Sequence, residues 1–184
     1  MSASTTPDTS DRIITSSRAA TRGITFFASV VAGAQMELSN FKELAGHVGH
    51  AFSPSGWEEI TQERIDRFAA VTGDNNWYHL DAERAARELP GGRTLAHGLL
   101  TLALVPGLSS QIFRVTAHGR ALNYGYEKLR FPEPVESGDR LRLHMEVTHA
   151  EPDRGGLMIR RNFKMEIEGK RRPGLVADAL TLAY

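Results

Sequence analysis

The sequence predicts an α+β fold, in which an antiparallel β-sheet packs against helices that precede it in the chain. In the first half of the chain, apolar residues recur at intervals of three and four, as in amphipathic helices. After Gly119 apolar and polar residues alternate, as in half-buried strands. Between these regions, residues 97–108 form a nearly continuous apolar segment, which predicts a buried helix that packs on the sheet.

Length and composition exclude several classes of protein. A chain of 184 residues is most simply one domain with a substantial core. Its 22 basic and 22 acidic residues balance, so we expect neither nucleic acid nor a membrane surface as a partner. The absence of cysteine excludes disulfides, thiolate nucleophiles and zinc–thiolate sites. No apolar run approaches the roughly 20 residues needed to span a bilayer. We therefore expect a soluble, cytoplasmic protein.

The first 36 residues differ in composition from the rest. They are rich in serine and threonine, and their only apolar cluster is Ile24–Val31. A secretory signal would need a longer uninterrupted apolar core than this cluster, which contains Thr25 and Ser29. We favour a disordered extension, or a mis-set start with Met36 as the true first residue.

Three helices are predicted before the apolar segment. The first covers Leu38 to about Val48. In the second, Thr61 is the expected N-cap, apolar residues follow at helical spacing, and Gly73 ends the helix. The third begins near Asp81, which is a suitable cap, and ends before Pro90.

The apolar segment and the strands complete the predicted fold. Pro106 should end or kink the apolar helix, because proline lacks the N–H that a helix interior requires. Four strands are expected to follow and to pair as successive hairpins, with a turn at Asp153–Gly156. In the third strand Arg161 interrupts a series of apolar residues of one parity. The expected strands are residues 123–131, 141–147, 157–167 and 175–184.

The candidate active site lies between the second and third helices, in the stretch Thr72–Asp81. Asp74 and His79 can approach one water molecule if the intervening residues turn back, and Gly73 and the asparagines favour such a turn. A carboxylate and an imidazole sharing a water can perform both proton transfers of a hydration reaction. At Gly98, the first turn of the apolar helix would offer a free N–H to a developing oxyanion.

Two neighbouring side chains have open roles. His97 is expected either to cap or pack the apolar helix or to lie at the edge of the site. Trp77 is expected either in the core or an interface, or at the site edge.

Three motifs give the chain a resemblance to a known family. They are Gly73-Asp74-x-Asn76-x-x-His79-x-Asp81, Leu95-Ala96-His97-Gly98, and Asn123-Tyr124-Gly125 followed by Arg130-Phe131-Pro132-Glu133-Pro134-Val135 and Gly138-Asp139. In this order they resemble the MaoC-like dehydratases, or R-specific enoyl-CoA hydratases, and within them the nodulation protein N (NodN-like) branch. The resemblance covers residues 37–184 and implies a single domain of the hotdog fold, in which the sheet wraps around a long central helix.

The resemblance also implies an activity. Asp74 and His79 would activate the water that adds to a trans-2-enoyl-CoA to give the (R)-3-hydroxyacyl-CoA, or catalyse the reverse dehydration. Asn76 would position that pair, and the Gly98 N–H would bind the thioester oxygen. The family further implies a homodimer, no metal and no cofactor, with CoA arriving as part of the substrate.

Two positions depart from the family's pattern. Trp77 stands where the better-known hydratases carry proline, and Pro106 stands where they often carry serine. Two other functions therefore remain open, namely an acyl-thioester hydrolase and a non-catalytic acyl-CoA-binding protein. Release of free thiol would identify the first, and binding without turnover would identify the second.

Overall fold

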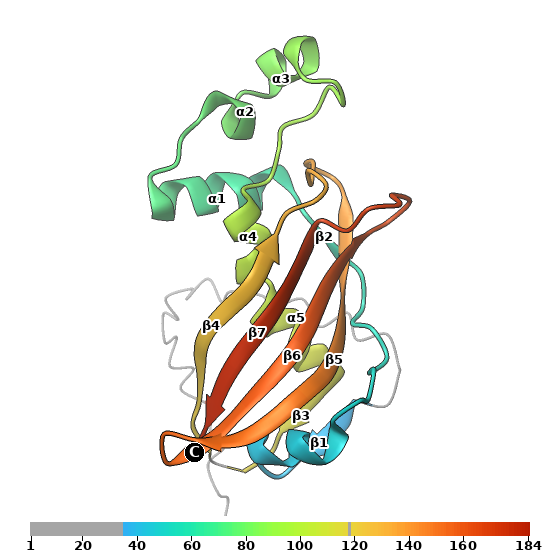
Figure 1. Ribbon diagram of the computed structural model, residues 1–184. Helices are drawn as coiled ribbons and strands as arrows, with labels where there is room; N and C mark the ends of the chain where they lie inside the picture. The colour runs from blue at the N-terminus through green and yellow to red at the C-terminus, as the bar shows by residue number, and fades with distance from the viewer. Residues whose placement is uncertain (1–34, 118) are drawn as a thin grey trace, which may run out of the picture.

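The computed structural model describes residues 35–117 and 119–184, and its main element is a five-stranded antiparallel sheet (Figure 1). The strands lie in the order β2-β5-β6-β7-β4. Their bounds are Glu58–Glu59 for β2, Ala121–Arg130 for β4, Arg140–Asp153 for β5, Gly156–Ile167 for β6 and Leu175–Ala183 for β7. The predicted strands and the tight turn between β5 and β6 are therefore confirmed, although each strand except the last is longer than its prediction. The prediction of successive hairpins is wrong for the first strand, because β4 pairs with β7 and not with β5.

The core lies on one face of this sheet, as the alternation predicts. Leu141, Leu143 and Met145 of β5 are at most 2% exposed. They pair with residues of β6 that are equally buried, such as Met165 opposite Leu143. Arg161 shares the inward face with these apolar residues and is only 8% exposed. The sequence pattern marks it as an exception, and the structure places it inside.

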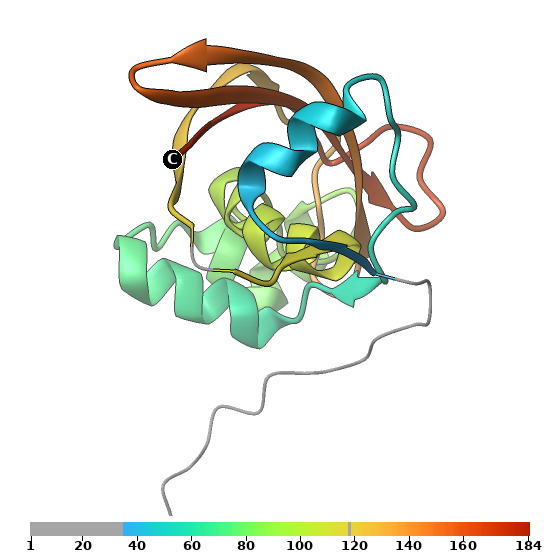
Figure 2. The ribbon, with the colours of Figure 1, turned by 90° about the horizontal axis from the view of Figure 1, so that it is seen from below.

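Two short helices, α4 (Gly98–Ala103) and α5 (Val105–Ile112), occupy the position of the predicted apolar helix. The sheet curves around them, as seen from below in Figure 2. The helix is interrupted at Leu104, where Pro106 lacks the N–H that would bond to the carbonyl of Leu102. It is also not buried on all sides in this single chain, because the Leu99 side chain is 59% exposed.

The N-terminal part differs from its prediction. Instead of an α-helix over Leu38–Val48, the chain forms strand β1 (Met36–Leu38) and the 3₁₀ helix η1 (Phe41–His47). β1 pairs in parallel with β3 (Phe113–Val115). Because of this pairing Leu38, the first residue of the predicted helix, is extended. Asn40 caps η1 by accepting a hydrogen bond from the Lys42 N–H. The expectation for residues 1–36 lies outside the described residues except for the last two.

Helices α1 (Gln62–Thr72), α2 (Trp77–Leu80) and α3 (Ala82–Glu88) form a layer beyond one end of the sheet (Figure 1). The predicted caps are confirmed: Thr61 accepts from the Arg64 N–H, and Asp81 accepts from the Arg84 N–H. α2 was not predicted, because Asn76 precedes it without a side-chain capping bond. No helix in the described residues is long and apolar enough to cross a membrane.

Candidate active site

The site begins where α1 ends. Gly73 adopts the left-handed conformation, with φ of 77°, and its N–H bonds to the carbonyl of Ala69. This conformation is readily accessible to glycine because it has no Cβ. The reversal places Asp74 directly after the helix, with its side chain 45% exposed. The carboxylate therefore stays in contact with solvent while its backbone is fixed.

His79 lies on α2 and is buried, with 6% of its surface exposed. Its Nδ1 lies 2.7 Å from the carbonyl oxygen of Leu95. Because a carbonyl can only accept, Nδ1 must carry the proton and donate it. In the neutral ring, Nε2 is then the unprotonated nitrogen. Leu95 thus sets the tautomer of His79, a role that the sequence does not reveal.

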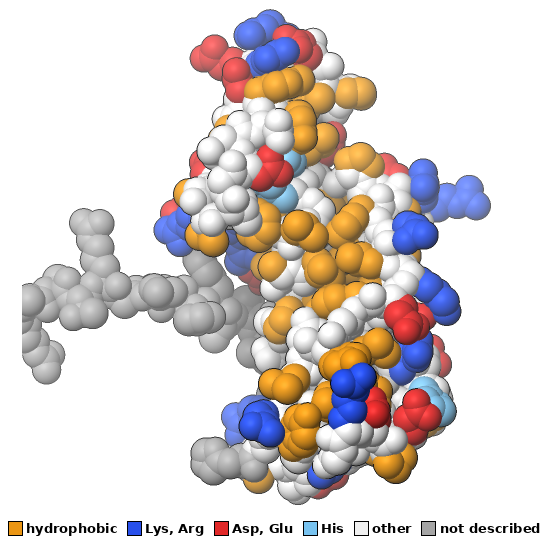
Figure 3. Space-filling view, turned by 60° about the vertical axis from the view of Figure 1, so that its left-hand side comes forward, with side chains coloured by type: hydrophobic (Ala, Val, Ile, Leu, Met, Phe, Trp, Pro, Cys, Tyr) orange, Lys and Arg blue, Asp and Glu red, His pale blue; other side chains and the backbone are white. Residues whose placement is uncertain are grey.

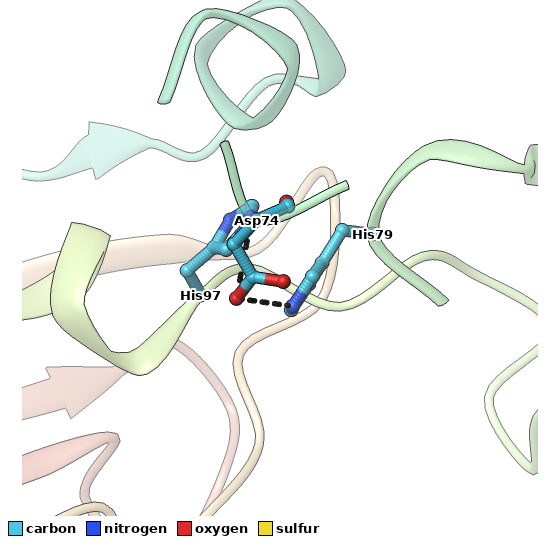
Figure 4. A group of neighbouring side chains, drawn as sticks. All are labelled: Asp74, His79 and His97. Carbon is cyan, nitrogen blue, oxygen red and sulfur yellow. Dashed lines mark hydrogen bonds and ion pairs between the residues drawn. The ribbon is translucent and has the colours of Figure 1, made fainter. Parts of the chain in front are cut away.

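Asp74 and His79 face each other across a short gap (Figure 4). His79 Nε2 lies 3.8 Å from Asp74 Oδ2. That distance is too long for a direct hydrogen bond and suits a bridging water. Asn76 donates from Nδ2 to the other carboxylate oxygen, Oδ1, and so holds the carboxylate in this orientation. The arrangement brings together the three candidate catalytic residues of the first motif, Asp74, Asn76 and His79.

His97 completes the cluster and resolves the two roles left open for it. It is the N-cap residue of α4, but its side chain makes no capping bond. Its ring instead stacks on that of His79, and its Nε2 lies 2.9 Å from the backbone carbonyl oxygen of Asp74. The ring is 4% exposed, and Nδ1 is buried without a partner among the described residues. His97 therefore lies within the cluster and braces Asp74 and His79.

The surroundings favour a neutral His79. Burial lowers the pKa of His79 below its usual value of 6.5, and the neighbouring His97 lowers it further. The bond to Leu95 and the charge of Asp74 act in the opposite direction but do not reverse the shift. A neutral imidazole with a free Nε2 is suited to accept a proton near pH 7.

Gly98 is the first residue of α4, next to the histidine pair. A Cβ at this position would lie 3.1 Å from the ring of Phe131, so any other side chain would press against that ring. As the first residue of a helix, it has an N–H with no acceptor within the helix. The N-terminus of α4 can therefore stabilise negative charge beside His79.

The other predicted site residues lie farther out. Trp77 stacks against Arg84 of α3, whose guanidinium carbon is 4.0 Å from the ring centroid. Its ring reaches His79 only through Tyr78, which contacts both rings. Pro106 lies on α5, beyond the break at Leu104.

The third motif supports the site without entering it. Asp139 is buried and accepts from Arg93 at 2.8 Å and from Lys170 at 2.9 Å. Its Oδ2 also accepts from the Glu136 N–H, which closes the turn before β5. The same turn binds the segment that leads into the site, because the Ala96 N–H donates to the Val135 carbonyl. The motif thus fixes the chain on the N-terminal side of His97.

Asp74, His79 and His97 offer ligand atoms within 4.8 Å of one another, which is close enough for a metal ion. The hydrogen bonds weigh against that use. His79 Nδ1 is occupied by Leu95, and His97 Nε2 is occupied by the Asp74 carbonyl. The ring nitrogens that face Asp74 Oδ2 are the two Nε2 atoms, so His79 Nε2 and the carboxylate are the ligands left. Two ligands fall short of the three protein ligands usual at a catalytic metal.

Comparison with known proteins identifies the family of the chain. Residues 43–162 match the MaoC like domain. The chain is 40% identical over 139 residues to 3-hydroxyacyl-thioester dehydratase Z of Mycobacterium tuberculosis, covering 75% of this chain and 91% of that protein. It is 34% identical to nodulation protein N of Rhizobium leguminosarum, covering 76% and 88% of the two chains.

A solved structure extends the similarity to the fold. The unliganded R-hydratase of Pseudomonas aeruginosa aligns with a TM-score of 0.64 and 28% identity, over 78% of this chain and 86% of that one. The match to the domain covers well over half of the chain, and the sheet curved around α4 and α5 is the hotdog arrangement. The chain therefore belongs to the MaoC-like domain family and is a hydro-lyase with the hotdog fold.

Proposed function

We propose that the protein hydrates trans-2-enoyl-CoA thioesters to (R)-3-hydroxyacyl-CoA, or catalyses the reverse dehydration. The observation that carries the proposal is the 3.8 Å gap between Asp74 Oδ2 and His79 Nε2, with the tautomer of His79 set by Leu95. A water in that gap can donate to both groups. The relatives named as a 3-hydroxyacyl-thioester dehydratase and an R-hydratase support the substrate class and the stereochemistry.

In the proposed reaction Asp74 orients the water and His79 accepts one of its protons as the oxygen bonds to C3. The electrons of the double bond move toward the thioester carbonyl and form an enolate. The Gly98 N–H, at the start of α4, stabilises the enolate oxygen. The imidazolium of His79, held beside the Asp74 carboxylate, then returns the proton to C2. Water is thus added completely, and His79 ends neutral.

The test is a spectrophotometric assay on crotonyl-CoA and a longer trans-2-enoyl-CoA, with chiral analysis of the product. Asp74→Asn and His79→Asn should each lower kcat by about 10²- to 10⁴-fold. The fold should persist in Asp74→Asn because that side chain is 45% exposed. Chelators should leave the wild-type rate unchanged. Activity retained in either variant, an (S)-product, or release of free thiol in place of hydration would contradict the proposal.

A homodimer is the second part of the proposal. On the face shown in Figure 3, hydrophobic side chains form a broad band bordered by charged ones. Edge strand β4 carries Leu122 and Tyr124, each 46% exposed, and Leu99 and Phe131 are similarly exposed beside the site. Burying them against a second copy would remove apolar surface from water. Light scattering after size exclusion should give twice the chain mass of 20.3 kDa, and a monomer mass would contradict the proposal.

A further inference from the structure

A second candidate binding site lies at the opposite end of the α4–α5 pair from Asp74 and His79. It is a cavity of about 400 Å³, a size typical of small-molecule sites. Its walls come from η1, α5, β3, β4, β6 and β7. Seven apolar side chains contribute to it, namely Phe41, Val105, Pro106, Phe113, Val115, Ala121 and Phe163. The polar side chains that line it include Ser109, Asn123, Tyr126, Arg161 and Thr181.

Arg161 is the only one of these polar residues that carries a full charge in the interior. It is 8% exposed, and it donates to Thr181 Oγ1 at 2.8 Å and weakly to Met145 Sδ at 3.7 Å. Its Nε has no partner, and no carboxylate lies within ion-pair distance among residues 35–117 and 119–184. The guanidinium of Arg161 lines the cavity and has five N–H groups, of which some remain without an acceptor.

Ser109, on the facing helix α5, shows the same condition. It is 6% exposed, and its hydroxyl has no hydrogen-bond partner among the described residues. Tyr126 accepts from Asn123 at 2.8 Å, so its own hydroxyl hydrogen remains available to an acceptor. Buried polar groups in folded proteins are almost always paired. Two orphans on opposite walls of one cavity indicate that the missing partner is a ligand.

The protein itself compensates the charge of Arg161 only in part. The guanidinium carbon lies 4.9 Å from the ring centroid of Phe163 and 5.2 Å from that of Phe41, so both rings offer cation–π contacts. Burial lowers the pKa of Arg161 to about 10, which still leaves the group charged at neutral pH. A buried cation without an anion is costly, and an anionic ligand would remove that cost.

The walls restrict the anion to one attached to an aliphatic chain. The remaining cation of the lining, Arg114, is 63% exposed and lies 3.5 Å from Glu37, so it is already compensated. One uncompensated cation matches a single negative charge, and the mainly apolar lining matches an aliphatic chain. We propose that the cavity binds an aliphatic chain that ends in a carboxylate, with Arg161 as the counter-charge and Ser109 as an additional donor.

The carboxylate has two possible sources. One is a free fatty acid. The other, which rests on the proposed hydratase function, is the far end of the acyl chain of the thioester. Ser109 follows Gly98 by eleven residues along α4 and α5, so the two lie at most about 16 Å apart along the helix direction. At about 1.2 Å per bond, as in an extended chain, roughly a dozen carbons cover that distance. An acyl chain of that length would place an ω-carboxylate near Arg161.

The first experiment measures binding and needs no enzymatic activity. Titration calorimetry compares decanoate with decanol and decylamine, each below its micellar concentration, on the wild-type protein. Decanoate should bind about tenfold or more tightly than decanol, because only the carboxylate can pair with Arg161. Equal affinity for the acid and the alcohol would overturn the proposal, and so would tighter binding of the amine.

Matched variants then assign the effect to the cavity. Arg161→Met should abolish the preference for the carboxylate, and Ser109→Ala should reduce it. Arg160→Gln removes a charge from the neighbouring residue of β6, which forms an ion pair with Glu127 instead, and should leave the preference intact. If Arg161→Met does not fold, Arg161→Gln, which is neutral and keeps a polar side chain, and Ser109→Ala still decide the matter. A preference that survives in all variants of the cavity would overturn the proposal.

The second experiment separates the two sources of the carboxylate. Hydration is measured on a twelve-carbon trans-2-enoyl-CoA and on its ω-carboxy analogue. If the carboxylate belongs to the substrate, the analogue has the higher kcat/KM, Arg161→Met removes that advantage, and Arg160→Gln keeps it. If decanoate binds without competing with either thioester, the ligand is a free acid. Both outcomes support the carboxylate site. A protein without hydratase activity would still be tested by the calorimetry.

Discussion

The imidazole rings of His79 and His97 lie face to face, with centroids 3.6 Å apart and planes inclined by 20°. The Nε2 atoms of the two rings lie 3.8 Å and 3.9 Å from the same oxygen, Asp74 Oδ2. A charge on one ring is repelled by a charge on the other, so protonation of one disfavours protonation of the other. The stacked pair therefore keeps His79 available as a base at neutral pH.

This relationship predicts the acid limb of the pH–rate profile. His79 must be neutral to accept a proton, and burial and His97 lower its pKa below 6.5. We expect kcat/KM to fall as the pH decreases, with its midpoint below 6.5. His97→Asn should move the midpoint to higher pH, though only in part, because burial is the larger cause. A wild-type midpoint at or above 6.5 would contradict this account.

The same shift has a consequence for stability. The folded protein binds a proton at His79 less readily than the unfolded chain does. The free energy of unfolding should therefore fall as the pH decreases from above 6.5 through the lowered pKa. Thermal melts of wild type and His79→Asn across pH 5–8 measure the effect, and the variant should show the weaker dependence. Parallel curves would show that other groups dominate.

Gly98→Ala tests the close approach of α4 to Phe131. The added Cβ would lie 3.1 Å from that ring, and such overpacking typically costs about 1–3 kcal/mol of stability. We expect a lower melting temperature and a lower kcat, because the N-terminus of α4 must shift. The double variant Gly98→Ala with Phe131→Leu should recover stability, with Phe131→Leu alone as the control. No recovery would mean that the ring is not the obstacle.

Asp139 should be important for stability. Burial would raise the pKa of Asp139, but the Glu136 N–H, Lys170 and Arg93 together lower it below the usual value. Asp139→Asn removes the more buried of the two carboxylates that hold Arg93 and Lys170, while both cations keep their contact with Glu136. We expect a loss of about 1–3 kcal/mol in chemical denaturation at pH 7.

The control for Asp139 is an exposed ion pair on the same sheet. Glu168→Gln breaks the pair with Arg140, in which both side chains are nearly half exposed, and should cost at most about 1 kcal/mol. Because the folded pKa of Asp139 is lowered, its contribution is present above pH 3.8 and is lost as the pH falls through the folded value. Equal losses in the two variants would contradict the role of the buried cluster.

Local sequence signals predicted the elements whose ends are fixed by local chemistry. Thr61, Gly73 and Asp81 delimit α1 and α3 as expected, since a capping side chain or a left-handed glycine acts on its own neighbours. The prediction of an α-helix over Leu38–Val48 was wrong because the helical spacing competes with β-strand pairing to a distant segment, which the sequence does not show. Leu38, the first residue of the predicted helix, pairs with Val115, far along the chain.

In the candidate site, too, contacts between residues close in sequence were predictable, and contacts that depend on tertiary packing were not. Asp74, Asn76 and His79 lie within six residues of one another, so a turn sufficed to predict their proximity. The stacking of His97 on His79 and the bond to Leu95 depend on how α4 packs against α2, which no local pattern specifies. Arg161 was passed over for a related reason, because a charged residue in an apolar series is usually exposed and its burial depends on the whole cavity.

The interruption at Leu104 separates α4, which borders Asp74 and His79, from α5, which lines the cavity. Rigid contacts hold α4, where Phe131 touches Gly98 and the carbonyl of Asp74 holds His97. α5 begins anew after Leu104 and carries Ser109 and Pro106, at the other end of the pair. A substitution at Ser109 or Pro106, which line the cavity, is therefore separated from the N-terminus of α4 by the break at Leu104. The two ends of the α4–α5 pair can be altered one at a time, the first to change the chemistry and the second to change the ligand that the cavity accepts.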